Sequence, residues 1–164
     1  LPVFVTQHMP ATFTTILAEH LGQASGMPAA EAKDGELAMP GRIYVAPGDF
    51  HMTVHAEGGC KVLRLDKNPP ENFCRPAVDP MLRSLAKAYT GKVLAVILTG
   101  MGQDGLKGGQ ELAAGGGVIA AQDEATSVVW GMPGSVASNG LCSAVLPLSD
   151  IGPYVRKAIS RMAA

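Results

Sequence analysis

The stretch V-L-A-V-I-L-T-G-M-G-Q-D-G at residues 93–105 decides the fold. Its six apolar residues run without interruption into a loop that holds three glycines and one carboxylate, Asp104. A continuous run of Val, Ile and Leu is typical of a strand buried in a parallel sheet, and the glycines predict a tight turn at its carboxyl end. Ligands and catalytic groups gather at that edge of open α/β sheets. The loop is therefore the first candidate for a functional site.

The same alternation of strands and helices extends to both sides of this loop. A helix over 106–114, stopped by the glycines at 115–117, and a strand over 118–121 complete one βαβ unit. Further strands are expected over 2–6, 43–46 and 142–146, further helices over 12–21, 132–138 and 151–162, and an antiparallel hairpin from 50–55 and 60–65. The pattern predicts an α/β fold, a three-layer α/β/α doubly wound domain with a mostly parallel sheet and a small antiparallel hairpin.

Two helix details follow from local patterns. In the helix over 12–21, the apolar residues Phe13, Ile16, Leu17 and Leu21 recur at helical spacing and should face the core. In the helix after the loop 67–75, Asp79 is expected to be the N-cap, with proline at the first helical position.

Composition excludes several classes of function. The 164 residues include 13 Lys+Arg and 14 Asp+Glu, a net charge of −1, so no basic surface for nucleic acid is expected. The longest apolar run is far too short to span a bilayer, so we expect no membrane insertion. The three cysteines are widely spaced and odd in number, which favours reduced thiols in a cytoplasmic protein.

The glycines of the loop also fit a rival interpretation. Gly100-x-Gly102-x-x-Gly105 matches the dinucleotide-binding pattern, with Asp123 and Glu124 about 20 residues on. However, the carboxylate of Asp104 would stand where a pyrophosphate should meet backbone amides, and it would repel that anion. A third interpretation is that the glycines serve only a tight turn.

His8 favours a catalytic interpretation of the loop. It ends the first expected strand, so its imidazole should project from the sheet edge that Asp104 reaches. A histidine at a strand end is more often structural when it stands alone. A histidine held by a buried carboxylate is, however, the core of a triad that activates a nucleophile.

Five motifs occur in an order that resembles a known family. They are Q-H-M-P at 7–10, A-P-G-D-F-H-M at 46–52, R-P-A-V-D at 75–79, I-L-T-G-M-G-Q-D-G at 97–105 and S-V-V-W-G-M-P at 127–133. Together they resemble the catalytic domain of the chemotaxis protein-glutamate methylesterases of the CheB type. The resemblance implies catalytic roles for His8 and Asp104. It places Met101, with Gly100 and Gly102, at the oxyanion and substrate edge.

The same resemblance implies the reaction and its partners. Family members hydrolyse γ-methyl esters of glutamates on the cytoplasmic helices of methyl-accepting chemoreceptors, and often deamidate receptor glutamines as protein-glutamine glutaminases. They use a Ser-His-Asp triad and need no cofactor. A receiver domain of two-component signalling is usually fused upstream.

The nucleophile is where the chain departs from the family. The family serine lies in an S-T-G-G turn upstream of Q-H-M-P, whereas residues 1–7 hold no serine. We therefore expect residues 1–164 to be the methylesterase catalytic domain, incomplete at its N-terminus and without the receiver domain. The alternative is a catalytically inactive homologue that only binds receptors.

Other polar residues receive structural interpretations. The Ser127 hydroxyl should bond to nearby loop backbone and not act as a nucleophile. Cys142 should behave as a small buried apolar residue, and His20 should be packed on its helix. His51 and His55 alternate along a strand but have no third ligand at sensible spacing, so no metal site is expected.

Overall fold

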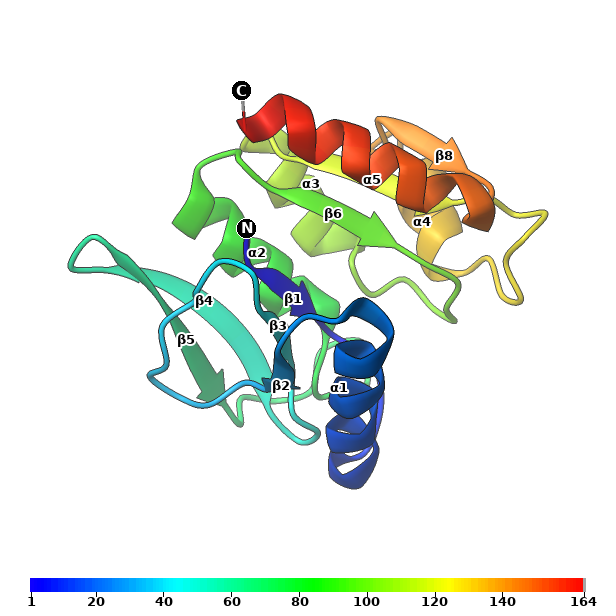
Figure 1. Cartoon of the computed structure of the whole chain (residues 1–164). Helices are drawn as coiled ribbons and strands as arrows, with labels where there is room; N and C mark the ends of the chain where they lie inside the picture. The colour runs from blue at the N-terminus through cyan, green and yellow to red at the C-terminus, as the bar shows by residue number, and fades with distance from the viewer. Residues whose placement is uncertain (164) are drawn as a thin grey trace.

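Two small parallel sheets form the centre of the computed structural model, which describes residues 1–163 (Figure 1). In the first half-sheet, β3 (Ile43–Val45) lies between β1 (Val3–Val5) and β2 (Ala29–Glu31). All of β3 is buried, and helix α1 (Ala11–Ser25) packs against it through Ala18. The strand β2 was not predicted, because its three residues carry no alternating pattern.

The second half-sheet contains the expected βαβ unit. Strand β6 (Leu94–Ile97), helix α3 (Leu106–Ala114) and strand β7 (Val118–Gln122) follow one another, and β6 and β7 pair in parallel. Strand β8 (Ala144–Leu146) extends the sheet beyond β7. Helices α4 (Met132–Ser138) and α5 (Leu148–Ala163) complete this half.

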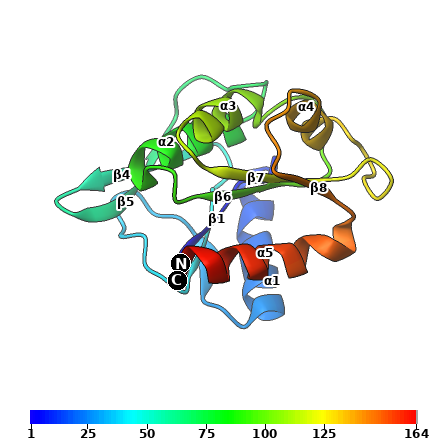
Figure 2. The ribbon, with the colours of Figure 1, turned by 90° about the horizontal axis from the view of Figure 1, so that it is seen from above.

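Helices cover the second half-sheet on both faces, as a three-layer fold requires. Figure 2 shows α3 and α4 on one side of β6, β7 and β8, together with α2 (Val78–Tyr89), and α5 on the other side. The core between sheet and helices is built from Ile97, Leu112, Ile119 and Val136. The predicted α/β architecture with a mostly parallel sheet is confirmed.

The antiparallel hairpin is also confirmed and forms a separate sheet, which shares a core cluster with Tyr44 of β3. Strands β4 (His51–Glu57) and β5 (Cys60–Asp66) pair along their full length. Helix α2 packs on the hairpin through Met81 and Leu85, which share a core cluster with Met52 and Leu63. Helix α2 therefore joins the hairpin to the second half-sheet.

The strands β1 and β6 are both edges of their sheets within the described residues. Although β1 and β6 are apolar, they are more open than β3: Val3 of β1 is 41% exposed, and only Ala95 and Ile97 of β6 are buried. Their carboxyl ends lead into the loops that carry His8 and Asp104 (Figure 1). None of the helices described over residues 1–163 is long and apolar enough to cross a membrane.

The face of α1 was predicted correctly only in part, since Leu17 and Leu21 pack against the core but Phe13 and Ile16 do not. Phe13 and Ile16 are 55% and 41% exposed, whereas Thr14 and Ala18 are buried. Thr14 is buried because its hydroxyl donates to the Glu31 carboxylate and accepts from the Gly48 N–H, two partners that are distant in sequence. His20 was expected to be packed, but it is exposed because it lies outside the buried face of α1.

The start of α2 also differs from the prediction. The helix begins at Val78 and its N-cap is Ala77, so Asp79 lies inside the first turn. The Asp79 carboxylate accepts hydrogen bonds from another helix, as described below, and that long-range use is invisible to local capping rules.

Candidate active site

His8 and Asp104 are joined by a hydrogen bond between the loops that follow β1 and β6. His8 Nε2 lies 2.6 Å from Asp104 Oδ2. The side chain of His8 is 25% exposed, whereas that of Asp104 is 2% exposed. The distance lies at the short end of the range for a positioned acid–base pair. Because Nε2 is engaged, Nδ1 is the ring nitrogen left for other chemistry.

The Asp104 carboxylate is surrounded by donors. Besides His8, its Oδ2 accepts from the Val78 N–H at 2.6 Å, and its Oδ1 accepts from the N–H groups of Asp79 and Gly105 at 3.0 Å. Val78 and Asp79 form the first turn of α2, whose N–H groups lack partners within the helix. The carboxylate therefore caps α2 from outside.

These donors keep Asp104 ionised. Burial acts to raise the pKa of Asp104, but the hydrogen bonds from His8 and from the amides of Val78 and Asp79 outweigh it, so the pKa lies below its usual range. A charged carboxylate at this position can orient the imidazole of His8 and stabilise its protonated form.

Asp79 performs the reciprocal task for the other helix. Its Oδ1 accepts from the N–H groups of Gly105 and Gly108 at the start of α3, at 3.1 and 2.7 Å. Asp104, which precedes α3, thus caps α2, while Asp79 in α2 caps α3. The two helices can pack closely because a Cβ at Gly108 would lie 2.8 Å from that of Leu82.

Gly48 of the A-P-G-D turn permits the approach of the chain that carries His8. A Cβ at position 48 would lie 2.2 Å from the Ala11 nitrogen and 2.6 Å from the Pro10 carbonyl carbon. Such contacts are impossible, so only glycine fits between the turn and the start of α1. The backbone two residues after His8 is held against this turn.

The candidate oxyanion residues lie in the loop before Asp104. The side chain of Met101 is 82% exposed, and Gly102 adopts a φ of 87°. Within residues 1–163, the backbone N–H groups of Met101 and Gly102 donate to no protein acceptor. Gly100 is fixed by its own backbone, since its N–H donates to Val129 and its carbonyl accepts from Met132. The loop therefore holds two backbone N–H groups without a protein acceptor, next to a glycine whose position is fixed by hydrogen bonds.

The geometry disfavours the dinucleotide interpretation. The N–H groups of Gly105 and Gly108, which a pyrophosphate would need, already donate to the Asp79 carboxylate. Asp104 adds a second buried negative charge beside them. Asp123 is also engaged, because its Oδ1 accepts from both the N–H and the hydroxyl of Thr126.

Ser127 and Cys142 behave as their structural interpretations predict. The Ser127 hydroxyl donates to the Asp123 carbonyl at 2.6 Å. Cys142 packs against the core of the second half-sheet, and burial raises the pKa of its thiol. His51 is buried, with Nε2 near the Pro69 carbonyl and Nδ1 accepting from the Ala77 N–H. Among residues 1–163 no three His, Cys, Asp or Glu side chains are grouped to hold a metal ion.

The family model for CheB methylesterase matches residues 1–155. The chain belongs to this family. A crystal structure of the Thermotoga maritima CheB methylesterase catalytic domain has the same fold, with a TM-score of 0.91 and 45% sequence identity. That similarity covers 97% of this chain and 82% of the Thermotoga chain.

Curated relatives of the CheB methylesterase family are more similar in sequence. A protein from Paramagnetospirillum magneticum named protein-glutamate methylesterase/protein-glutamine glutaminase 1 is 67% identical over 160 residues. A protein from Azospirillum brasilense with the same name, apart from the final numeral, is 67% identical over 163 residues. The matches cover 98% and 99% of this chain but only 42% and 41% of those relatives.

Sequence reasoning missed one residue of the site, Asn72. Its amide Nδ2 donates to both Asp79 Oδ2 at 2.9 Å and Asp104 Oδ1 at 3.0 Å. The residue lies in a loop without periodicity, and no local pattern marks its partners. An asparagine a few residues before the R-P-A-V-D motif was the one available clue.

Proposed function

We propose that residues 1–164 are the catalytic domain of a protein-glutamate methylesterase. The proposed substrates are γ-methyl esters of glutamates on the cytoplasmic helices of chemoreceptors. Membership of the CheB methylesterase family and the names of the two 67% identical relatives support this proposal. The observation that carries it is the 2.6 Å hydrogen bond between His8 and a buried, ionised Asp104.

The proposed reaction is acyl transfer in two halves. A serine hydroxyl attacks the ester carbonyl while His8 Nδ1 takes the hydroxyl proton. The tetrahedral intermediate collapses when His8 returns the proton to the leaving oxygen, which departs as methanol. Water then attacks the acyl-serine by the same route and releases the glutamate carboxylate and the serine. With a glutamine substrate the leaving group is ammonia, which accounts for a glutaminase activity.

The two residues beside the serine have distinct tasks. Asp104 holds the tautomer of His8 that carries its proton on Nε2, and it stabilises the imidazolium without taking the proton. In this arrangement the base is Nδ1, because Nε2 is bound to the carboxylate. The free N–H of Met101, together with that of Gly102, is the proposed donor to the oxyanion. No cofactor takes part in these steps.

We further propose that the serine comes from a segment that precedes Leu1 in the full protein. The chain spans about two fifths of the length of its curated relatives, so a longer protein has room for such a segment and for a receiver domain. In the part of the chain that the structure describes, β1 and β6 each have a free edge, and each leads into one residue of the pair. A strand between them would join the two half-sheets and bring its carboxyl end to His8.

The chemoreceptor substrate fits an open site. Two cavities, of about 360 and 290 Å³, are lined by residues other than His8 and Asp104. Beside the site, Met101 and Val128 are 82% and 91% exposed, on two loops joined through the hydrogen bond from Gly100 to Val129. An exposed apolar rim of this kind suits the side of an amphipathic helix better than a small free metabolite.

The test uses the full native protein and receptor fragments that carry methylated glutamates. His8→Gln should lower methanol release by at least about a thousandfold, because the base is lost. His20→Gln is the matched control, since His20 is exposed on α1 and takes no part in the His8–Asp104 hydrogen bond. Equal activity of the His8→Gln and unmodified proteins would exclude the proposed mechanism.

An inactive receptor-binding homologue is the alternative, and the native sequence before Leu1 separates the two. A serine in a glycine-containing turn after an apolar strand supports the esterase. A native sequence without such a serine, with methanol release absent from the full protein, supports the binding module.

A further inference from the structure

Asn72 connects the two buried carboxylates of the site. Its amide nitrogen lies 2.9 Å from Asp79 Oδ2 and 3.0 Å from Asp104 Oδ1. An amide group carries two hydrogens, so each carboxylate receives one. Asp79 and Asp104 are 0% and 1% exposed. Asn72 thus supplies each of them with a donor that water does not provide.

The chemistry of this donor suits a carboxylate that must remain charged. An arginine or lysine at position 72 would neutralise Asp104 and compete with His8 for it. The amide of Asn72 is uncharged, so it fixes the rotation of the carboxylate and leaves the charge for the imidazole. Because Oδ1 accepts from Asn72, Asp79 and Gly105, Oδ2 is directed at His8.

Asn72 lies in a tight turn whose two ends are joined by hydrogen bonds. Asn72 and Phe73 adopt φ values of 51° and 64°, in the left-handed region where asparagine is enriched. The flanking residues Glu71 and Cys74 exchange backbone hydrogen bonds. The turn therefore sets the direction of the Asn72 amide.

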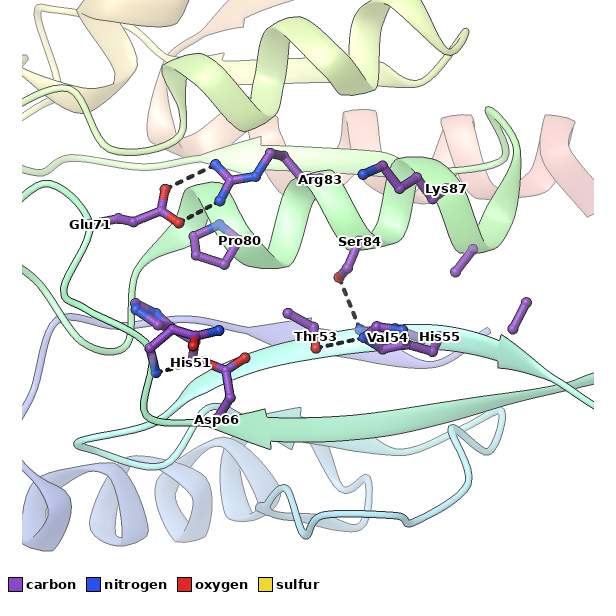
Figure 3. Close-up of a pocket in the computed structure, with 13 residues that line it drawn as sticks. His51, Thr53, Val54, His55, Asp66, Glu71, Pro80, Arg83, Ser84 and Lys87 are labelled. Carbon is purple, nitrogen blue, oxygen red and sulfur yellow. Dashed lines mark hydrogen bonds and ion pairs between the residues drawn. The ribbon is translucent and has the colours of Figure 1, made fainter.

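Glu71 ties the same turn to α2. Its carboxylate forms two hydrogen bonds with the Arg83 guanidinium, one of them 2.9 Å long. Figure 3 shows this pair on the wall of the cavity of about 360 Å³ between α2 and β4. Since α2 also carries Asp79 and donates to Asp104, the turn, the helix and the carboxylate form one connected unit.

We infer that Asn72 is a positioning residue for Asp104 and, through Asp104, for the imidazole of His8. The inference rests on the proposed function and adds a residue to its machinery. Asn72 does not touch the reacting atoms; it acts by fixing the carboxylate. A purely structural role in capping α2 and α3 is the competing interpretation, and it predicts altered stability with an unchanged His8–Asp104 bond.

The experiment replaces Asn72 in the full native protein. Asn72→Gly removes the amide and retains a residue that tolerates the left-handed backbone. We expect kcat for the methyl ester to fall roughly tenfold to a hundredfold, because a misplaced base costs about that much, with KM unchanged. Asn68→Gly is the matched control: the same exchange in the same loop removes an exposed amide that does not donate to Asp79 or Asp104, so kcat should change by less than about a factor of three.

A second measurement does not depend on substrate. The proton in the His8–Asp104 hydrogen bond should give a far-downfield proton NMR resonance in the unmodified protein and in Asn68→Gly. In Asn72→Gly this resonance should move upfield or broaden beyond detection. If the unmodified protein shows the resonance but releases no methanol, the proposed function fails while the positioning inference is still decided by the resonance.

The measurements on Asn72→Gly can overturn the inference in two ways. A folded Asn72→Gly protein with kcat within about a factor of two and an unchanged resonance overturns the inference. If Asn72→Gly does not fold, Asn72→Ser is measured in its place, since its hydroxyl can serve only one of the two carboxylates. If neither variant folds, Asn72 is a structural residue and the inference is overturned as well.

Discussion

At the scale of single residues, Asp104 is the centre of the site because it receives five hydrogen bonds. They come from the side chains of His8 and Asn72 and from three backbone N–H groups. Such a carboxylate both orients its neighbour and stabilises the fold. The sequence pattern suggested only the first task, because nothing in it shows that the loop residue is buried.

Asp104→Asn should therefore affect both turnover and stability. The NH2 group of the introduced asparagine would face at least one of the surrounding N–H groups, and two donors cannot bond to each other. The amide would also favour the wrong tautomer of His8. We expect the rate of methyl ester hydrolysis to fall on the order of a hundredfold or more. The measurement is methanol release by the full protein. Near-normal release would remove Asp104 from the mechanism.

The same variant has a predictable pH dependence. The pKa of Asp104 is lowered in the folded state, so its stabilising contribution is complete above about pH 4 and is lost as the pH falls through the folded pKa. The free energy of unfolding of the unmodified protein should therefore drop more steeply below pH 4 than that of Asp104→Asn. Urea unfolding of both proteins at pH 7 and pH 3 measures how much free energy of unfolding each loses between the two pH values.

At the scale of elements, the turn before β4 places the segment that carries His8. Gly48 contacts the backbone at the start of α1 so closely that no side chain fits, although its own φ is not positive. The contact is reinforced by the hydrogen bond from the Gly48 N–H to Thr14. Strand β3, α1 and the His8 loop are consequently fixed to one another.

Gly48→Ala should disrupt this arrangement. The added Cβ would meet backbone atoms that cannot rotate away, so we expect a loss of about 3 kcal/mol in the free energy of unfolding. Hydrolysis should fall as well, since His8 moves with Pro10. Gly152→Ala is the matched control, because its Cβ meets only the end of the Arg156 side chain at 3.8 Å. Equal stability of the two variants would contradict the steric argument.

Elements whose residues interact locally were predicted well. Helices α3 and α4 have the predicted bounds, because glycines, a proline and the apolar runs define their ends nearby in sequence. The wrong predictions concern residues whose burial or hydrogen bonding depends on partners distant in sequence. Thr14 is buried where it forms hydrogen bonds with Glu31 and Gly48. Asp79 caps α3 and does not cap its own helix.

In the candidate site, too, some residues could be predicted from the sequence and others could not. His8 and Asp104 could be paired from the sequence because parallel strands deliver their carboxyl ends to one edge. Asn72 could not, since its role depends on the fold of an irregular loop against two helices.

At the scale of the whole molecule, the two half-sheets are linked by loops, by α2 and by the His8–Asp104 bond. Among residues 1–163, one edge of β1 and one edge of β6 have no partner strand. In a parallel strand, successive backbone groups point to opposite sides. The Val3 N–H donates toward β3, so the Phe4 N–H points away from it. By the same alternation, the Val96 N–H points away from β7, since the Val93 carbonyl accepts from that strand.

Hydrogen exchange can test whether a further strand fills this position in the full protein. If a strand from the segment before Leu1 joins the half-sheets, the amides of Phe4 and Val96 should exchange as slowly as that of Tyr44. Tyr44 is the internal standard, because β3 is paired on both sides. Fast exchange at Phe4 and Val96 beside slow exchange at Tyr44 would argue against an inserted strand.

The separation of His8 and Asp104 along the chain has a consequence for how the protein acquires its activity. The two residues are 96 positions apart, and each lies beyond a strand that pairs only with distant partners. Folding slows as contacting residues become more distant in sequence, because the chain must close long loops before those contacts repay the lost entropy. Helices and the hairpin can therefore form while the acid and the base are still apart. We therefore expect the His8–Asp104 pair to form late in folding, so that partly folded chains carry both residues without the proposed site.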